Sequence, residues 1–78
     1  MQTERLITMA NQIGDFFKYF PDKEQAKKDI AQHLMRFWAS SMRQQILAHV
    51  NENAGKGLDP IVRDAISEHM DAHLSTSD

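Results

Sequence analysis

One helix ends and a second begins within residues 16–25, which read FFKYFPDKEQ. Pro21 blocks continuation of the first helix, because proline has no backbone N–H to donate and its ring clashes with the preceding turn. Asp22 is a suitable N-cap for the second helix, and Gln25, three residues later, stands at the matching position of a capping box. The stretch therefore predicts two consecutive helices joined by a sharp break.

Upstream of this break, residues 3–20 have the periodicity of an amphipathic helix. Apolar residues recur at spacings of three and four, which gathers them within about 120° on a helical wheel. They are Leu6, Met9, Ile13, Phe16, Phe17 and Phe20. Asn11, Gln12 and Gly14 interrupt the pattern. Glycine would let another helix approach closely, and the amides either bond to a partner's backbone or are ordinary solvated positions.

Downstream of the break, residues 23–38 predict a second helix with two apolar lines. One line holds Ala26, Ile30, Leu34 and Phe37, and the adjoining line holds Ala31, Met35 and Trp38. Such a wide apolar face suits two arrangements. Either the helix lies centrally in a bundle and touches two neighbours, or it touches one neighbour inside and a partner outside. The sequence leaves both open.

Two further helices follow. Ser40 or Ser41 is suited to cap a third helix, which ends by Asn53. A loop with two glycines comes next, and Asp59-Pro60 is a typical start for a fourth helix that runs to about His73. Since no strand pattern or repeat appears, the sequence predicts an all-α fold. We expect a small compact bundle of about four short helices, with one domain over residues 1–74 and a frayed polar tail over residues 75–78.

Composition narrows the functions that this chain could have. It has 78 residues and no cysteine, which excludes disulfides and thiolate metal sites. It has no signal-peptide pattern and no apolar run of the roughly 18 residues that a membrane-spanning helix needs. The formal net charge of −2 argues against nucleic acid, which normally requires a basic excess. No nucleophile motif or identifiable carboxylate pair indicates an enzyme.

A candidate docking stretch lies in residues 36–43, which read RFWASSMR and contain no acidic residue. Arginine, tryptophan and phenylalanine are enriched where proteins contact proteins. The alternative is that the two aromatic residues are core residues at a helix end. We predict partner contacts at Arg36, Phe37, Trp38 and Arg43, followed by Asn11 and Gln12.

A weak metal candidate is the pair His69 and His73, which stand four residues apart on one side of the predicted fourth helix. A third ligand is not evident, and the His-Glu-x-x-His pattern is absent. Histidines near a helix C-terminus also interact favourably with the helix dipole, and this structural role is the preferred interpretation.

Several ordered segments of the chain resemble one known family. They read MANQIG (residues 9–14), FF (16–17), PD (21–22), HLMRFW (33–38), MR (42–43), AHV (48–50) and GLDPIV (57–62). Together they resemble the small delta subunit of NAD-dependent formate dehydrogenases over about residues 6–66. The segment Ala39-Ser40-Ser41 departs from the family pattern, in which Asp-Pro is typical after the tryptophan.

This resemblance implies a non-catalytic accessory subunit of a cytoplasmic formate dehydrogenase that reduces NAD⁺. In such enzymes the molybdenum or tungsten pterin and iron–sulfur centres lie in the catalytic alpha subunit, and FMN with further clusters lies in other subunits. The delta subunit binds none of these groups. The resemblance implies that it binds the alpha subunit and supports assembly, stability or cofactor maturation.

Two other functions stay open from the residues themselves. The chain could be a free-standing module that forms a homodimer through its aromatic face. It could also be a helical regulator that reads nucleic acid through the third helix, with Arg43, Gln44 and Gln45 facing the bases, although its charge disfavours this.

Overall fold

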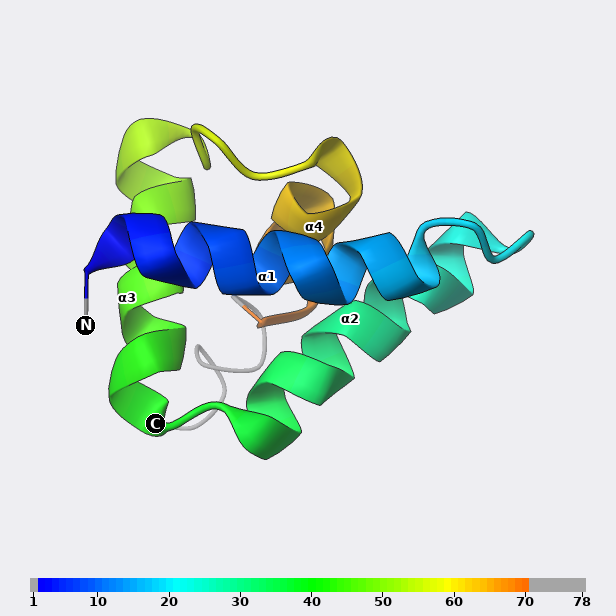
Figure 1. Cartoon of the computed structure of the whole chain (residues 1–78), viewed down its shortest axis with the longest axis horizontal. Coiled ribbons are helices and arrows are strands. Elements are labelled where there is room, and N and C mark those ends of the chain that lie inside the picture. Colours follow the sequence, from blue (N-terminus) through cyan, green and yellow to red (C-terminus); the bar gives the residue numbers. More distant parts are fainter. Residues whose placement is uncertain (1, 71–78) are drawn as a thin grey trace.

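Four α-helices and a π-helical turn make up the regular structure of residues 2–70, the part of the chain that the computed structural model describes (Figure 1). In chain order they are α1 (Thr3–Phe17), α2 (Lys23–Phe37), α3 (Ser40–Asn53), α4 (Pro60–Ala65) and the π-helical turn η1 (Ile66–Met70). The prediction of an all-α bundle of about four short helices is confirmed. The predicted domain end at residue 74 and the polar tail lie outside the described residues.

The second helix, α2, occupies the centre of the bundle. It contacts α1, α3, α4 and η1, while α1 also packs on α3 and α4. Its fully buried residues, Ala26, Ile30, Ala31 and Leu34, come from both apolar lines of the sequence. The first of the two arrangements that the sequence left open is therefore the one adopted.

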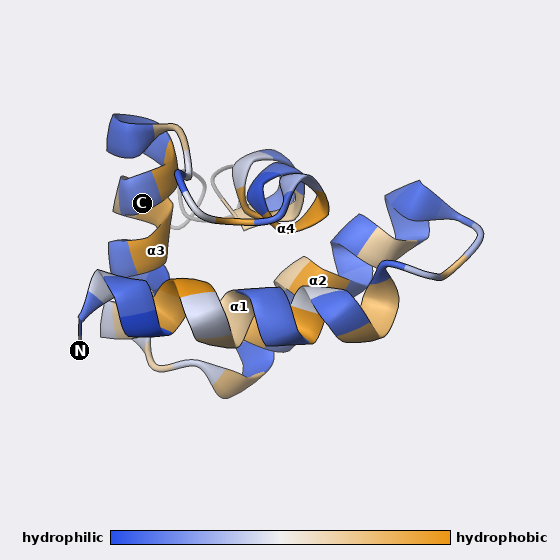
Figure 2. Cartoon of the chain, turned by 45° about the horizontal axis from the view of Figure 1, so that its top comes forward, coloured by the Kyte–Doolittle hydropathy of each residue, from blue (hydrophilic) through white to orange (hydrophobic). Residues whose placement is uncertain are grey.

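A single core joins all the elements. The largest fully buried side chains are Leu6, Ile30, Leu34, Ile46, Val62, Ile66 and Met70. Figure 2 shows the hydrophobic side of α3 turned toward the other helices. Burying each such side chain contributes about 1.5–3 kcal/mol to folding, so this cluster is the main stabilising feature of a chain without disulfides.

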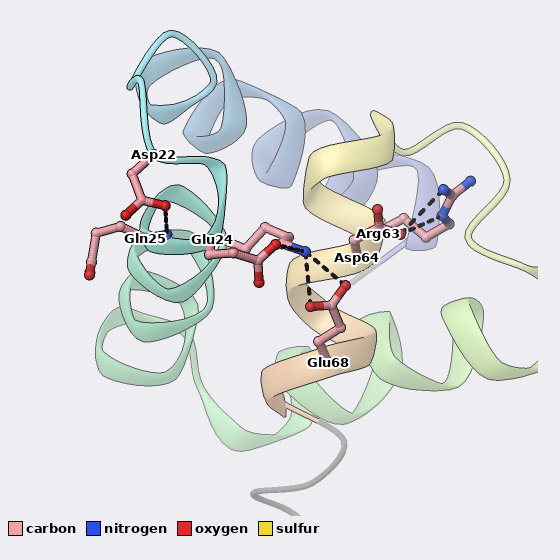
Figure 3. Close-up of polar contacts among 7 residues, drawn as sticks. Asp22, Glu24, Gln25, Arg63, Asp64 and Glu68 are labelled. Carbon is pink, nitrogen blue, oxygen red and sulfur yellow. Dashed lines mark hydrogen bonds and ion pairs between the residues drawn. The ribbon is translucent and has the colours of Figure 1, made fainter.

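The break between α1 and α2 is built largely as predicted. The Asp22 carboxylate accepts a hydrogen bond from the backbone N–H of Gln25 at 3.2 Å, as an N-cap should (Figure 3). The first helix ends at Phe17, three residues before the predicted end at Phe20. The chain instead closes a tight turn, in which the Phe20 N–H bonds to the Phe17 carbonyl at 3.0 Å. Because a residue that precedes proline disfavours the helical conformation, Phe20 is an unfavourable position for the helix to reach.

The start of α3 differs from the prediction. Ala39 occupies the N-cap position, and no side chain caps the helix. Ser40 and Ser41 lie inside the first turn, where the Ser40 hydroxyl accepts a hydrogen bond from the Gln44 amide at 3.3 Å. The predicted serine cap is therefore wrong, because the chain becomes helical one residue before a serine could take that position.

The loop between α3 and α4 uses the left-handed backbone conformations that its glycines permit. Gly55 has φ 68° and Gly57 has φ 92°, and Ala54, the C-cap of α3, has φ 56°. Helix α4 then begins at Pro60 with Asp59 in the cap position, as the sequence predicts. The loop therefore returns the chain to the first helix within a few residues.

The π-helical turn changes which side chains face the core after α4. A π-helix has a wider turn than an α-helix, so the inward position falls one residue later. Met70 is consequently buried, at 1% exposure, whereas His69 is only half-buried. The sequence had placed His69 and His73 in line with the core residues. His73 lies outside the described residues.

Two ties fix α4 and η1 against the first two helices. Gly14 of α1 faces Val62 of α4 so closely that a methyl group at position 14 would overlap the valine methyl. On the other side, Lys27 of α2 pairs with Glu24 at 2.8 Å and with Glu68 of η1 at 2.9 Å (Figure 3). The prediction that Gly14 allows close helix approach is confirmed.

Replacing Gly14 with alanine tests this close approach. Alanine favours a helix by about 1 kcal/mol over glycine, but the overlap with Val62 costs about 1–3 kcal/mol, so we expect a net loss of stability. In a Val62→Ala background the same replacement should become neutral or stabilising, because the obstructing methyl is gone. Urea unfolding of the wild type, the two single variants and the double variant measures both effects. Stabilisation of the wild-type background by Gly14→Ala would contradict the packing.

Candidate docking surface

Four large hydrophobic side chains are exposed on the described part of the chain. Phe16 is 70% exposed, Tyr19 79%, Phe37 66% and Phe20 37%. We call these four residues the aromatic surface. Three of them lie at the α1–α2 turn, which projects from one end of the molecule (Figure 1). Exposed rings of this size are unusual on a small soluble domain and are typical of surfaces that contact other molecules.

The rings at the α1–α2 turn form a packed cluster with Phe17 at its base. The Phe17 ring meets Phe16 edge-on at a centroid distance of 4.9 Å and Phe20 at 5.3 Å. Phe17 is half-buried and packs against the core. It therefore holds its two neighbours in fixed positions while they face solvent.

The fourth ring lies at the end of α2, beside a shallow hollow of about 240 Å³. The Phe37 ring lies against the His33 ring at a centroid distance of 4.7 Å, with the two planes tilted by 44°. The Arg36 guanidinium lies over the Phe37 ring at 5.6 Å. The hollow is lined by Phe17, Asp29, Gln32, His33, Arg36 and Phe37. Phe17 thus belongs both to the ring cluster and to the hollow, which links the two halves of the surface.

Trp38 lies in the core and not on a docking surface, which corrects its predicted role. Its exposure is 7%, whereas its neighbour Phe37 is 66% exposed. The physical reason is local. Helix α2 ends at Phe37, and the extended backbone of Trp38 (φ −88°, ψ 143°) takes the indole out of the helical phase and into the core cluster. Phe37 is helical, as predicted, and follows the inner line of Ala26, Ile30 and Leu34, but at this end of α2 its side chain is exposed.

The two predicted arginines have different surroundings. Arg36 is exposed, and its only described side-chain contact is the Phe37 ring. Arg43 is half-buried and its Nη1 donates a hydrogen bond of 2.6 Å to the Met35 carbonyl near the end of α2. Its Nε is buried without a hydrogen-bond partner in the described structure. A cation at a helix C-terminus interacts favourably with the helix dipole, so Arg43 also stabilises the α2–α3 junction.

The Asn11 side chain forms hydrogen bonds within the chain. Its amide nitrogen donates to the Gly57 carbonyl at 3.0 Å, and its amide oxygen accepts from the Asp59 N–H at 2.9 Å. It therefore fastens the loop before α4 onto α1, while its predicted contact with a partner stays a prediction. Gln12, the next residue, is exposed as that prediction requires.

A second hollow, of about 500 Å³, lies between the α1–α2 turn and the start of α4. Its three lysines already have partners. Lys18 pairs with Asp15 at 3.0 Å, which raises the lysine pKa, and Lys23 donates to the Lys18 carbonyl. Hydrogen bonds to Glu24 and Glu68 likewise raise the pKa of Lys27. Two of the three lysines of this hollow are thus paired with carboxylates of the chain, and the third is bonded to a carbonyl.

No metal site is apparent in residues 2–70. No three His, Asp or Glu side chains of this part gather closely enough to hold an ion. The His69 Nε2 is buried without a hydrogen-bond partner there, and its proposed companion, His73, lies outside the described residues. The histidine pair therefore stays a prediction.

Sequence reasoning missed the exposure of Phe16, Tyr19 and Phe20. The periodicity put both phenylalanines on the inner face of the first helix, but the residues fully buried there are Leu6 and Ala10, with Gly14 beside them. A usable signal was present. Four of the five residues 16–20 are aromatic, which is more ring area than one narrow helix face can bury.

Fold and surface together define a class: a small all-α domain that exposes aromatic rings at one end and on one helix. The comparison with known families is more specific. Residues 5–66 match the family described as NADH-dependent formate dehydrogenase delta subunit FdsD, and the chain belongs to this family. No match was found among curated proteins or among solved structures. Within residues 2–70, no helix combines the length and apolar character needed to cross a membrane.

The contrast between Trp38 and Phe37 can be tested by stability alone. We expect Trp38→Ala to lower the free energy of unfolding by about 3–5 kcal/mol, because it opens a cavity in the core. Phe37→Ala should change it by less than about 0.5 kcal/mol, since the ring is mostly in solvent. Urea unfolding followed by circular dichroism measures both. Similar losses for the two variants would contradict the assigned positions.

A second stability measurement addresses Asn11. Asn11→Ala removes two hydrogen bonds and leaves a backbone N–H and a carbonyl without their partners, which should cost about 1–3 kcal/mol. The matched control is Gln12→Ala, which removes an exposed amide one residue along and should change stability by less than about 0.5 kcal/mol. Equal effects of the two variants would show that Asn11 does not fasten the loop.

Proposed function

We propose that this chain is a non-catalytic accessory subunit of a cytoplasmic NADH-dependent formate dehydrogenase. It docks onto the molybdopterin-containing catalytic alpha subunit through the aromatic surface and supports that subunit's assembly, stability or cofactor maturation. The observation that carries the proposal is the exposure of Phe16, Tyr19 and Phe37 on a chain of the delta-subunit family.

The energetics favour a protein partner for these rings. Fully burying a large hydrophobic side chain contributes about 1.5–3 kcal/mol, so three rings contribute about 5–9 kcal/mol. Association costs at least about 4 kcal/mol in lost rotational and translational freedom. The aromatic surface therefore supplies much of the energy for docking, and polar contacts around it supply the rest.

The chemistry of formate oxidation belongs to other subunits in this proposal. Iron–sulfur clusters are held by cysteine thiolates, and the chain has no cysteine. The molybdenum or tungsten pterin, the clusters, FMN and NAD are accordingly assigned to the remaining subunits of the complex. This chain contributes surface and no redox group.

Co-purification with the enzyme tests the docking. Tagged chain is co-produced with the other formate dehydrogenase subunits, and the recovered catalytic subunit and its formate-dependent NAD⁺ reduction are measured. We expect Phe16→Ser and Phe37→Ser, alone and together, to reduce recovery by about tenfold or more, because each removes a ring that the partner buries. Both residues are exposed, so the variants should keep the wild-type thermal transition.

The matched control is Asn51→Ser, an exposed position in the last turn of α3, away from the α1–α2 turn (Figure 1). It should leave recovery unchanged. Full recovery of the catalytic subunit with the double serine variant would reject the aromatic surface. If the chain is recovered only as a homodimer, and the serine variants dissociate it, the self-associating module would be favoured instead.

A further inference from the structure

Charge is unevenly divided along this chain. Residues 30–51, which form most of α2 and nearly all of α3, contain Arg36 and Arg43 but no aspartate or glutamate. With a formal net charge of −2 for the whole chain, this segment carries +2 and the remaining residues carry −4. The α2 part and the α3 part of this segment join at the α2–α3 junction. We call Arg36, Phe37 and Arg43 at this junction the basic corner.

Within residues 2–70, the two arginines of the basic corner are among the lysines and arginines that form no ion pair. The ion pairs of the described residues use Lys18, Lys27 and Arg63. Neither Arg36 nor Arg43 forms one. Arg43 donates to a carbonyl and keeps a buried Nε without a hydrogen bond within the described residues, and Arg36 lies over the Phe37 ring. Most of the hydrogen-bonding capacity of Arg36 is therefore free for a ligand.

The surroundings of Arg36 limit what this ligand can be. The guanidinium lies over the exposed Phe37 ring, next to the hollow that Phe17 and His33 also line. One carboxylate, Asp29, lines the same hollow, and it accepts a hydrogen bond from the Gln25 amide at 3.0 Å. Asp29 stands seven residues before Arg36, about 10 Å along the helix axis. The site thus offers an apolar ring and a cation side by side.

We infer that the basic corner receives an acidic segment of the formate dehydrogenase partner, with a carboxylate on Arg36 and an apolar side chain against Phe37. The inference rests on the proposed function and specifies the chemistry of its partner. Arginine suits this role because its planar guanidinium binds a carboxylate through two parallel hydrogen bonds while its face stays on the ring.

A protein carboxylate fits the corner better than a nucleic acid does. Nucleic-acid binding depends on many phosphate contacts, about six to ten for a typical specific protein. The corner offers two arginines, one of them half-buried, on a chain whose remaining residues carry −4. The negative charge of the remaining residues repels a long polyanion, whereas a single acidic segment needs to approach only the two arginines.

Affinity measurements with charge variants test the inference. The full-length chain is titrated onto formate dehydrogenase purified without it, at about 50 mM and about 500 mM salt. Arg36→Gln should weaken binding severalfold at low salt, and Arg36→Glu should weaken it by about tenfold more, because like charges then meet. The difference between these two variants should shrink at high salt.

The matched control is Lys56→Glu, the same reversal of charge on an exposed residue of the α3–α4 loop. It should change the affinity by less than about twofold, because that loop is not part of the corner. An equal effect of Lys56→Glu and Arg36→Glu would mean that only net charge matters, and would overturn the inference. Competition of binding by duplex DNA would overturn it in favour of a nucleic acid.

Comparison with Phe37→Ser separates this inference from the proposed function. Loss of binding with Phe37→Ser and retention with Arg36→Glu would keep the docking surface but reject the acidic partner. Wild-type affinity in both variants would reject the surface itself. Absence of any binding by the wild-type chain would reject both.

Discussion

The close contact between Gly14 and Val62 is the constraint on which the rest of the structure depends. Helix α4 is too short to be stable alone, and it holds its place because α1 has no side chain where the two helices meet. Asn11, one turn earlier on α1, fastens the preceding loop by two hydrogen bonds. Together the two residues bring α4 and η1 onto α2, and their buried residues Val62, Ile66 and Met70 complete the core.

The same packing explains why several aromatic rings are exposed to solvent and not buried in the core. The core of this small domain is filled mainly by aliphatic side chains and one indole, and the ends of α1 and α2 extend the chain's aromatic residues past it. Exposed phenylalanines gain little from folding, and exposed apolar patches are typical of surfaces that contact other molecules. Phe17 packs against the core and also contacts the exposed Phe16 ring, so it connects the core to the aromatic surface.

The sequence predicts the helices well and their ends and faces less well. The break at Pro21, the cap at Asp22, the loop glycines and the start at Pro60 all follow from local backbone chemistry, which depends on few residues. The burial of Trp38 does not, because its extended backbone at the end of α2 departs from the helical periodicity. Asn11 stands out in the sequence as an amide that interrupts an apolar pattern. Its hydrogen-bond partners are not predictable from local sequence, because they lie 46 and 48 residues away. Met70 faces the core only because a π-helical turn shifts the register, and periodicity assumes none.

The uneven charge of the chain also has a kinetic consequence. A molecule with +2 on one segment and −4 elsewhere has a permanent dipole. In the field of the acidic segment proposed above, it would turn its positive side forward before the surfaces touch. The orientational search normally holds protein association to about 10⁵–10⁷ per molar per second, well below the diffusion limit. Two arginines that form no ion pair within residues 2–70 would thus shorten the search for the correct approach as well as strengthen the final contact.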